Sequence, residues 1–143
     1  YEVTPNNGSS IKDTLNHLSR EVTAVAARQW SLVATQVDPV WESNDQGECI
    51  RANTALLSLL ERTMEQMQAN EWENLIHRDD AKWVLAEWSR AVSQRRAFEA
   101  VFRVEAYVSK RVFRVTCIST AFKANDGSVL GYIGRYTNVK EIT

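Results

Sequence analysis

The sequence predicts one α+β domain: short helices inserted between the second and third strands of a five-stranded antiparallel sheet, preceded by an amphipathic N-terminal helix. Three observations lead to this fold class. Apolar residues recur at helical spacing before Asp38, two short runs of strand-like residues flank a turn at 44–47, and three longer alternating runs close the chain. Helices gathered between groups of antiparallel strands are typical of the α+β class.

The N-terminal part divides into a polar leader over residues 1–10, expected to be flexible, and a helix over residues 11–37. Its apolar side chains follow steps of three and four and form one stripe, as in a coiled coil. Asp38-Pro39 requires extended backbone, so the helix ends there and the domain over residues 38–143 begins. The stripe consists of Ile11, Leu15, Leu18, Val22, Val25 and Leu32.

The middle of the chain alternates between short strands and short helices. Asn44 to Gly47 has the composition of a tight turn, so the runs beside it are expected to form a hairpin. Asn53 is suited to cap the next helix, because its side-chain oxygen can accept backbone N–H groups. The expected elements are strands over 40–43 and 48–52, helices over 54–60 and 63–69, and a stronger helix that opens at Asp79 or Asp80 and carries Trp83, Val84, Trp88 and Val92.

The last part of the chain predicts three antiparallel strands, over 98–106, 112–122 and 129–137. Phe98, Phe102 and Val104 alternate with polar or small residues and share one face of the first strand. The second strand is partly apolar on both faces. Asn125-Asp126-Gly127 is a strong hairpin signal between the second strand and the third.

Composition excludes several classes of protein. The 143 residues fit one domain with a short extension, and the formal net charge of −1 gives no general attraction to nucleic acid or anionic lipid. No run approaches the ~18 apolar residues of a membrane span, and no signal peptide is present, so we expect a cytoplasmic protein. Cys49 and Cys117 are too few and too far apart for a disulfide framework or a zinc knuckle. Since the chain starts without methionine, we expect a piece of a longer protein or a processed product.

The stretch WENLIHRDD, from Trp72 to Asp80, resembles a metal or acid–base cluster at first sight. However, no further histidine or glutamate stands at ligand spacing from His77, and a zinc site takes three or four protein ligands. The favoured interpretation is a joint in which Asp79 or Asp80 caps a helix while His77 holds the loop. The chain also lacks a nucleophile elbow, a phosphate loop and a dinucleotide fingerprint, so we expect neither a metal site nor catalysis.

The order of elements and four motifs resemble a PAS domain, of the subclass found in bacterial sensor kinases and diguanylate cyclases. The motifs are Gly47 to Asn53, similar to the family's G-x-I-x-x-x-N; Trp72 to Asp80, similar to W-x-x-x-x-H-P-x-D; Phe98 to Val104, similar to F-E-x-x-x-R; and Gly131 to Asn138, similar to the closing strand. The sequence departs from the family at Arg78, where proline is usual, at Ser109-Lys110, where Asp-Gly is usual, and at Asn138-Val139-Lys140, where Asp-Ile-Thr is usual.

The resemblance implies a non-catalytic sensory, ligand-binding and dimerisation module of a multidomain bacterial signal-transduction protein. The output would be a histidine kinase of a two-component system, a diguanylate cyclase or a transcription regulator, with Asn138 passing the signal on. The N-terminal stripe would form a homodimer, or pack within its own chain over an outward patch of Val101, Phe113, Val115 and Cys117. Two alternatives stay open: a structural dimerisation module without ligand, and an FAD-binding redox sensor.

The resemblance also implies a cavity between the sheet and the central helices. Arg114 is the distinctive candidate, because an arginine in an apolar pocket could hold the carboxylate of a small anionic or aromatic ligand; it could equally pair with an internal glutamate or point to solvent. The candidate pocket residues are Trp72, Leu75, Trp83, Trp88, Phe102, Val104, Arg114, Thr116, Ile118, Tyr132 and Tyr136.

Cofactor expectations follow from residues that the family's cofactor-binding branches require. Covalent FMN photochemistry needs a cysteine in an N-C-R-F-L motif, where this chain has Asn70-Glu71-Trp72-Glu73. Haem needs an axial histidine on the later helix, and residues 80–96 contain none. We therefore expect no cofactor, with non-covalent FAD as the alternative that the aromatic content allows.

Overall fold

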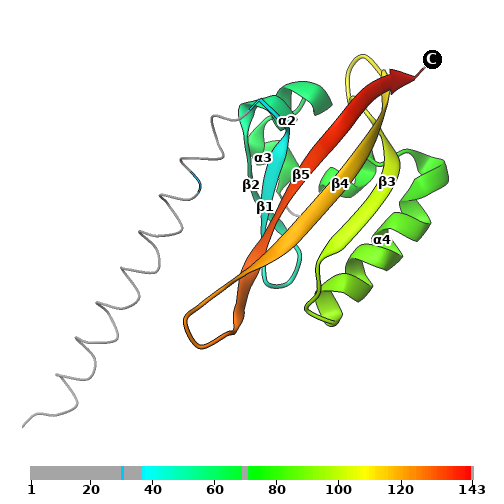
Figure 1. Ribbon diagram of the computed structural model, residues 1–143. Helices are drawn as coiled ribbons and strands as arrows, with labels where there is room; N and C mark the ends of the chain where they lie inside the picture. Colours follow the sequence, from blue (N-terminus) through cyan, green and yellow to red (C-terminus); the bar gives the residue numbers. More distant parts are fainter. Residues whose placement is uncertain (1–29, 31–36, 69–70, 143) are drawn as a thin grey trace, which may run out of the picture. The chain divides into compact units, whose positions relative to one another are not determined.

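The computed structural model describes Trp30, residues 37–68 and residues 71–142; apart from Trp30, these belong to one compact unit. Five antiparallel strands form one sheet in the order β2-β1-β5-β4-β3 (Figure 1). The elements are β1 (Val40–Asn44), β2 (Cys49–Ala52), α2 (Thr54–Leu60), α3 (Met64–Met67), the 3₁₀ helix η1 (Glu71–Leu75), α4 (Arg78–Ser93), β3 (Phe98–Glu105), β4 (Val112–Lys123) and β5 (Val129–Ile142). The predicted α+β class, with helices between the second and third strands, is confirmed.

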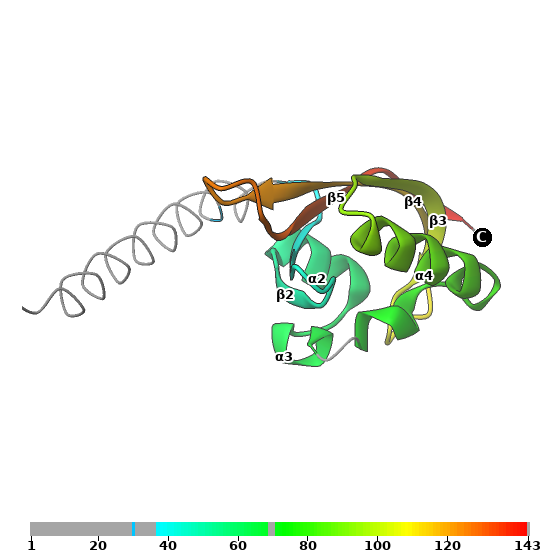
Figure 2. The ribbon, with the colours of Figure 1, turned by 90° about the horizontal axis from the view of Figure 1, so that it is seen from below.

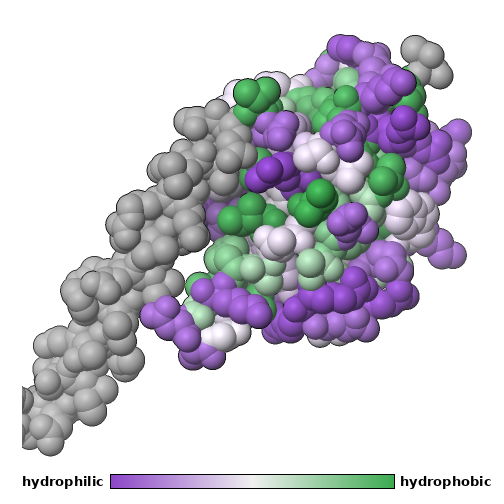
Figure 3. Space-filling model, in the orientation of Figure 1, coloured by the Kyte–Doolittle hydropathy of each residue, from purple (hydrophilic) through white to green (hydrophobic). Residues whose placement is uncertain are grey.

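The helices lie together on one face of the sheet, as the view from below shows (Figure 2). The core fills the space between this helical layer and the sheet. The opposite face is turned toward the viewer in Figure 3, where apolar side chains lie among polar ones. Val101 and Ile118 belong to this outer face and are 53% and 40% exposed.

Apart from Trp30 and Val37, the predicted N-terminal leader and helix lie outside the described residues, together with all six residues of the stripe. Within the part of the chain that the structure describes, no helix is long and apolar enough to cross a membrane.

Asn53 fastens the start of α2 to the start of β1. Its side-chain oxygen accepts the backbone N–H of Leu56 at 3.0 Å, which caps α2 as predicted, and also the N–H of Val40 at 3.0 Å. Its amide nitrogen donates to the Asp38 carbonyl at 2.9 Å. Asn53 is only 2% exposed, so these bonds satisfy polar groups that water does not reach.

The start of α4 differs from the prediction. The helix begins at Arg78, and the cap is His77, whose Nδ1 accepts the N–H of Asp79 at 3.1 Å; Asp79 and Asp80 lie in the first turn instead. Arg78 thereby occupies the first helical position, whose N–H has no partner within a helix. Proline suits that position because its missing N–H costs no helical hydrogen bond there, but the position does not require proline and also accommodates arginine.

Asp80 joins α4 to the edge strand β3. Its carboxylate accepts the Arg103 guanidinium at 2.9 and 2.7 Å and the Arg103 backbone N–H at 2.9 Å. The hydrogen bonds from the Arg103 guanidinium lower the pKa of Asp80 more than burial raises it, so this pKa falls to about 2. The acidic residue expected to cap a helix is therefore part of an ion pair between two elements.

The two faces of β4 are the reverse of the predicted ones. Cross-strand partners lie on the same face of a sheet. Phe102 pairs with Val115 and Ala100 pairs with Cys117, so the helix-facing side of β3 continues into Val115 and Cys117. Both are buried and Phe113 is partly buried, which corrects their predicted outward position, whereas Val101 does face outward. Arg114, Thr116 and Ile118 therefore lie on the outer face.

Asp80→Asn is expected to destabilise the domain by about 2 kcal/mol at neutral pH, because the pKa difference between folded and unfolded Asp80 corresponds to that free energy. Since the folded pKa is depressed, this contribution is complete above the unfolded value of 3.8 and disappears as pH falls toward about 2. Urea unfolding of both proteins between pH 2 and 7 measures it. Asp79→Asn, at an exposed carboxylate, should cost less than about 1 kcal/mol. Equal losses for the two variants would contradict the assignment.

Thiol labelling tests the faces of β4. In the native protein Cys49 and Cys117 are buried, and burial raises their pKa values to about 11 and about 12, so few thiolates are available. Ile118→Cys should react with a disulfide reagent at pH 8 at least about a hundred-fold faster than the native cysteines, because its side chain faces outward. Val115→Cys, on the inner face, should stay as slow as the native thiols. Fast labelling at 115 with slow labelling at 118 would instead support the faces predicted from the sequence, with residue 115 outward and residue 118 inward.

Candidate functional site

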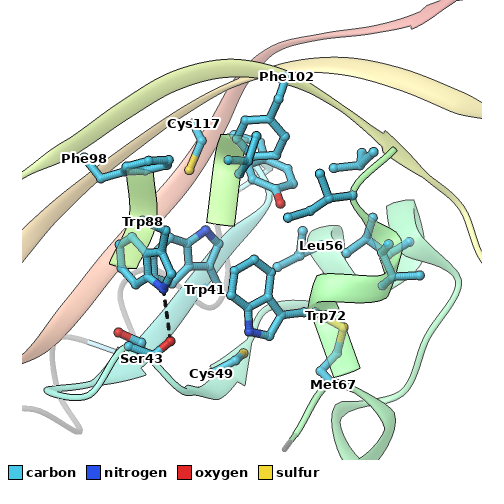
Figure 4. Close-up of a pocket in the computed structure, with 17 residues that line it drawn as sticks. Trp41, Ser43, Cys49, Leu56, Met67, Trp72, Trp88, Phe98, Phe102 and Cys117 are labelled. Carbon is cyan, nitrogen blue, oxygen red and sulfur yellow. Dashed lines mark hydrogen bonds between the residues drawn. The ribbon is translucent and has the colours of Figure 1, made fainter. Parts of the chain in front are cut away.

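A cavity of about 40 Å³ lies in the core between the sheet and the helical layer. Figure 4 shows the 17 side chains around it, which come from both layers. The lining consists of Trp41, Ser43, Gly47, Cys49, Leu56, Leu60, Met67, Trp72, Leu75, Ile76, Val84, Trp88, Phe98, Phe102, Val104, Cys117 and Tyr136.

Three tryptophans from three elements supply much of the wall. Trp88 of α4 packs edge-on against Trp41 of β1, with ring centroids 5.2 Å apart, and donates its indole N–H to the Gly47 carbonyl at 3.2 Å. Trp41 lies over Gly134, its partner on β5. A Cβ atom at Gly134 would come within 2.1 Å of the Trp41 ring, so glycine is what lets this ring lie flat on the sheet. Trp72, of η1, completes the group (Figure 4).

The lining is uncharged throughout the described residues, since it contains no Asp, Glu, Lys, Arg or His. Burial keeps the titratable lining groups neutral as well: it raises the pKa of Cys49 to about 11, that of Cys117 to about 12, and that of the Tyr136 hydroxyl well above its usual value. No side chain of the described lining therefore carries a charge at neutral pH.

One fully buried polar atom of the lining lacks a partner, and the Tyr136 hydroxyl makes no hydrogen bond within the described residues either. The Ser43 hydroxyl donates to the Asn44 carbonyl, and the Trp88 indole N–H is used by Gly47. The Trp72 indole nitrogen Nε1, in contrast, is buried and makes no hydrogen bond. A buried hydrogen-bond donor without an acceptor costs ~1–3 kcal/mol of stability, so this position favours a ligand that carries an acceptor atom.

Six of the eleven predicted pocket residues line the cavity: Trp72, Leu75, Trp88, Phe102, Val104 and Tyr136. Tyr132 is fully buried beside it, packed edge-on against Trp88, and its hydroxyl donates to the Val92 carbonyl at 3.4 Å. The structure thus brings most of the predicted aromatic and aliphatic wall together; whether these residues contact a ligand stays a prediction.

Four predicted pocket residues lie elsewhere. Trp83 is 42% exposed, because α4 turns Asp80, Val84, Trp88 and Ala91 inward and residue 83 falls outside that stripe. Arg114, Thr116 and Ile118 lie on the outer face of β4 for the reason of register given above. Arg114 stands opposite Arg103 and Lys140, so it cannot hold a carboxylate inside the cavity.

The sequence prediction omitted several lining residues, above all Trp41 and the two cysteines. The signal for Trp41 was present, since residues 40–43 were expected to form a strand and Trp41 and Ser43 share one face of it. Cys117 was missed because β4 was assigned the wrong face. Leu56, Leu60 and Met67 come from short helices whose inward residues depend on how each helix is placed.

Asn138, the predicted output residue, lies in an irregularity of β5. Thr116 pairs with Thr137 and Arg114 with Lys140, so Asn138 and Val139 together oppose Val115. This is a β-bulge, and Asn138 has a left-handed backbone with φ 52°, a conformation that asparagine tolerates better than most residues. It borders a wider groove of about 550 Å³, separate from the core cavity.

Metal ligation finds no support in the described ranges, where no three His, Cys, Asp or Glu side chains gather. His77 is the helix cap and lies outside the cavity lining.

Solved structures with this fold share little sequence with the chain. A PAS domain from Colwellia psychrerythraea has a TM-score of 0.63 at 15% identity, over 83% of this chain and 98% of that one. The N-terminal domain of a diguanylate cyclase with PAS/PAC sensor from Marinobacter aquaeolei has 0.61 at 17% identity, over 69% and 92%. A LOV protein from Rhodobacter sphaeroides has 0.61 at 14% identity, over 76% and 61%.

Family membership is shown by sequence as well as by fold. No curated protein matches the chain significantly. The family model described as the PAS fold, however, matches residues 49–136, which include β2, the helical layer and most of the remaining sheet. The predicted resemblance is thereby confirmed: the chain belongs to the PAS fold family.

Proposed function

We propose that this PAS domain is the sensory module of a multidomain signalling protein and that its core cavity receives a small ligand. The observation that carries the proposal is the cavity itself: an uncharged space with one unmet donor at the junction of sheet and helices. A ligand there would contact β1, β3 and β5 as well as α4, so its binding free energy could shift the equilibrium between arrangements of these elements.

The wider context is part of the same proposal. The similarity to the PAS domain of a diguanylate cyclase supports an output domain of that kind, or a histidine kinase of a two-component system, in a bacterial cytoplasm. Dimerisation through the stripe from Ile11 to Leu32 rests on its heptad-like spacing. The β-bulge at Asn138 is the proposed point at which β5 passes the signal on.

A non-catalytic role accords with the chemistry around the cavity. PAS domains are in general sensory modules without catalytic activity. The cavity wall holds two thiols and a phenol, all kept protonated by burial, and no described base lies among them. A nucleophile needs an adjacent base or a lowered pKa, and the lining provides neither.

A flavin does not fit the cavity as it is built. Pockets for ligands of that size have ~300–1,000 Å³, against about 40 Å³ here. The side chains of Trp41, Trp72 and Trp88 fill the region that an enlarged pocket would need (Figure 4). We therefore propose a cofactor-free domain. Absorbance of freshly purified protein tests this, since the visible bands of a bound flavin would contradict it.

Ligand access to the cavity can be measured with xenon, which enters small apolar cavities. Xenon should shift amide resonances of residues that line the cavity, and Val104→Ile should weaken binding by at least about three-fold, because the added methyl group takes up part of the space. Val101→Ile makes the same change on the same strand but on the outer face, so it should leave xenon binding unchanged.

Two results would contradict the proposal that the cavity receives a ligand. If xenon and a library of small fragments leave every cavity resonance unchanged, the cavity is closed and the domain is a structural module without ligand. If Val101→Ile weakens binding as much as Val104→Ile, the xenon site lies outside the cavity.

A further inference from the structure

The chemistry of the cavity restricts its ligand further, on the premise of the proposed function that a ligand binds there. An ion moved into this site would leave water and meet no counter-charge, because no described lining residue is charged. The only arginine proposed to supply a counter-charge, Arg114, lies on the outer face of β4. The wall therefore disfavours carboxylates, phosphates and ammonium groups alike.

The fully buried, unpartnered indole N–H of the wall then specifies what kind of neutral molecule suits the cavity. Trp72 Nε1–H is a donor with no acceptor capacity, and it is buried without a partner. Figure 4 shows the nitrogen on the side of the ring nearest Cys49, which does not bond to it. A ligand that carries an acceptor atom removes the cost of this unmet donor, whereas a hydrocarbon or a pure donor does not.

The size of the space sets the third restriction. One water molecule needs roughly 10–15 Å³ of such volume, so about 40 Å³ accommodates roughly three or four non-hydrogen atoms. The rings of Trp41, Trp88 and Phe98, which pack edge-on in the same core, surround the remaining space.

We propose that the cavity is selective for a small uncharged molecule of about four non-hydrogen atoms that is largely apolar and carries one hydrogen-bond acceptor, which receives the indole N–H of Trp72. Low-molecular-weight ketones, aldehydes and ethers have this chemistry. Trp72 is thereby the specificity-determining residue, and the apolar lining residues supply shape and exclude water.

Three probes with four non-hydrogen atoms each separate charge, acceptor and shape: acetone, acetate and isobutene. In titrations of the full chain followed by amide and indole N–H resonances, acetone should bind at the cavity with a Kd of about 0.1–10 mM, as expected of so small a ligand. Isobutene, which lacks the acceptor, should bind about five-fold more weakly. Acetate should leave the cavity resonances unchanged at the same concentrations.

Trp72→Phe removes the donor while keeping an aromatic ring. It should abolish the preference for acetone over isobutene, because the larger space acts on both ligands while only acetone loses a hydrogen bond. Trp83→Phe, at an exposed tryptophan outside the lining, should alter neither affinity. In the wild-type protein, the Trp72 indole proton should move downfield with acetone and not with isobutene, which reports the hydrogen bond directly and would not follow from a structural role alone.

The outcomes distinguish this inference from the proposed function. If acetate binds the cavity as tightly as acetone, or if acetone and isobutene bind alike in both wild type and Trp72→Phe, the ligand class is wrong although the cavity binds ligands. If none of the three probes, xenon or a fragment library reaches the cavity, the proposed function itself fails.

Discussion

The indole of Trp88 holds the domain together, because one side chain joins α4 to four other parts of the chain. Its ring packs edge-on against Trp41 of β1, Phe98 of β3 and Tyr132 of β5, with centroids 5.2 to 5.4 Å apart. Its N–H reaches the Gly47 carbonyl in the β1–β2 hairpin. Each aromatic contact is worth ~0.5–1.5 kcal/mol beyond burial, so this cluster fixes the helical layer against the sheet. The cavity lies beside it and takes its shape from it.

Hydrogen bonds and ion pairs outside this aromatic cluster fix the position of the surrounding helices and strands. Asn53 connects the start of β1 to α2, and Asp80 connects α4 to the edge of β3 through Arg103. Glu61, in a left-handed conformation at the end of α2, accepts the N–H groups of Val108 and Ser109. Ion pairs and charged hydrogen bonds thus lie around the cavity, while the cavity wall itself is neutral. This separation is what makes the proposed ligand uncharged.

Much of the architecture could be predicted because local sequence fixes it. The turn at Asn44 to Gly47, the cap at Asn53 and the hairpin at Asn125 to Gly127 depend on residues whose side chains or backbone freedom act within a few positions. The inward face of β3 was also predictable, since its alternation is clear. By contrast, His77 rather than an aspartate caps α4, because the second aspartate is drawn to an arginine 23 positions further on.

The sequence by itself determined the order of elements, the family and the aromatic wall on α4 and β3. Only the tertiary structure decided which face of β4 meets the core, because that strand is apolar on both faces and its inner residues depend on which residue of β3 each one opposes. That pairing moved Arg114 out of the cavity and Cys117 into it. The small volume of the cavity could not be predicted from the sequence either, since it results from how Trp41, Trp72 and Trp88 are packed around it.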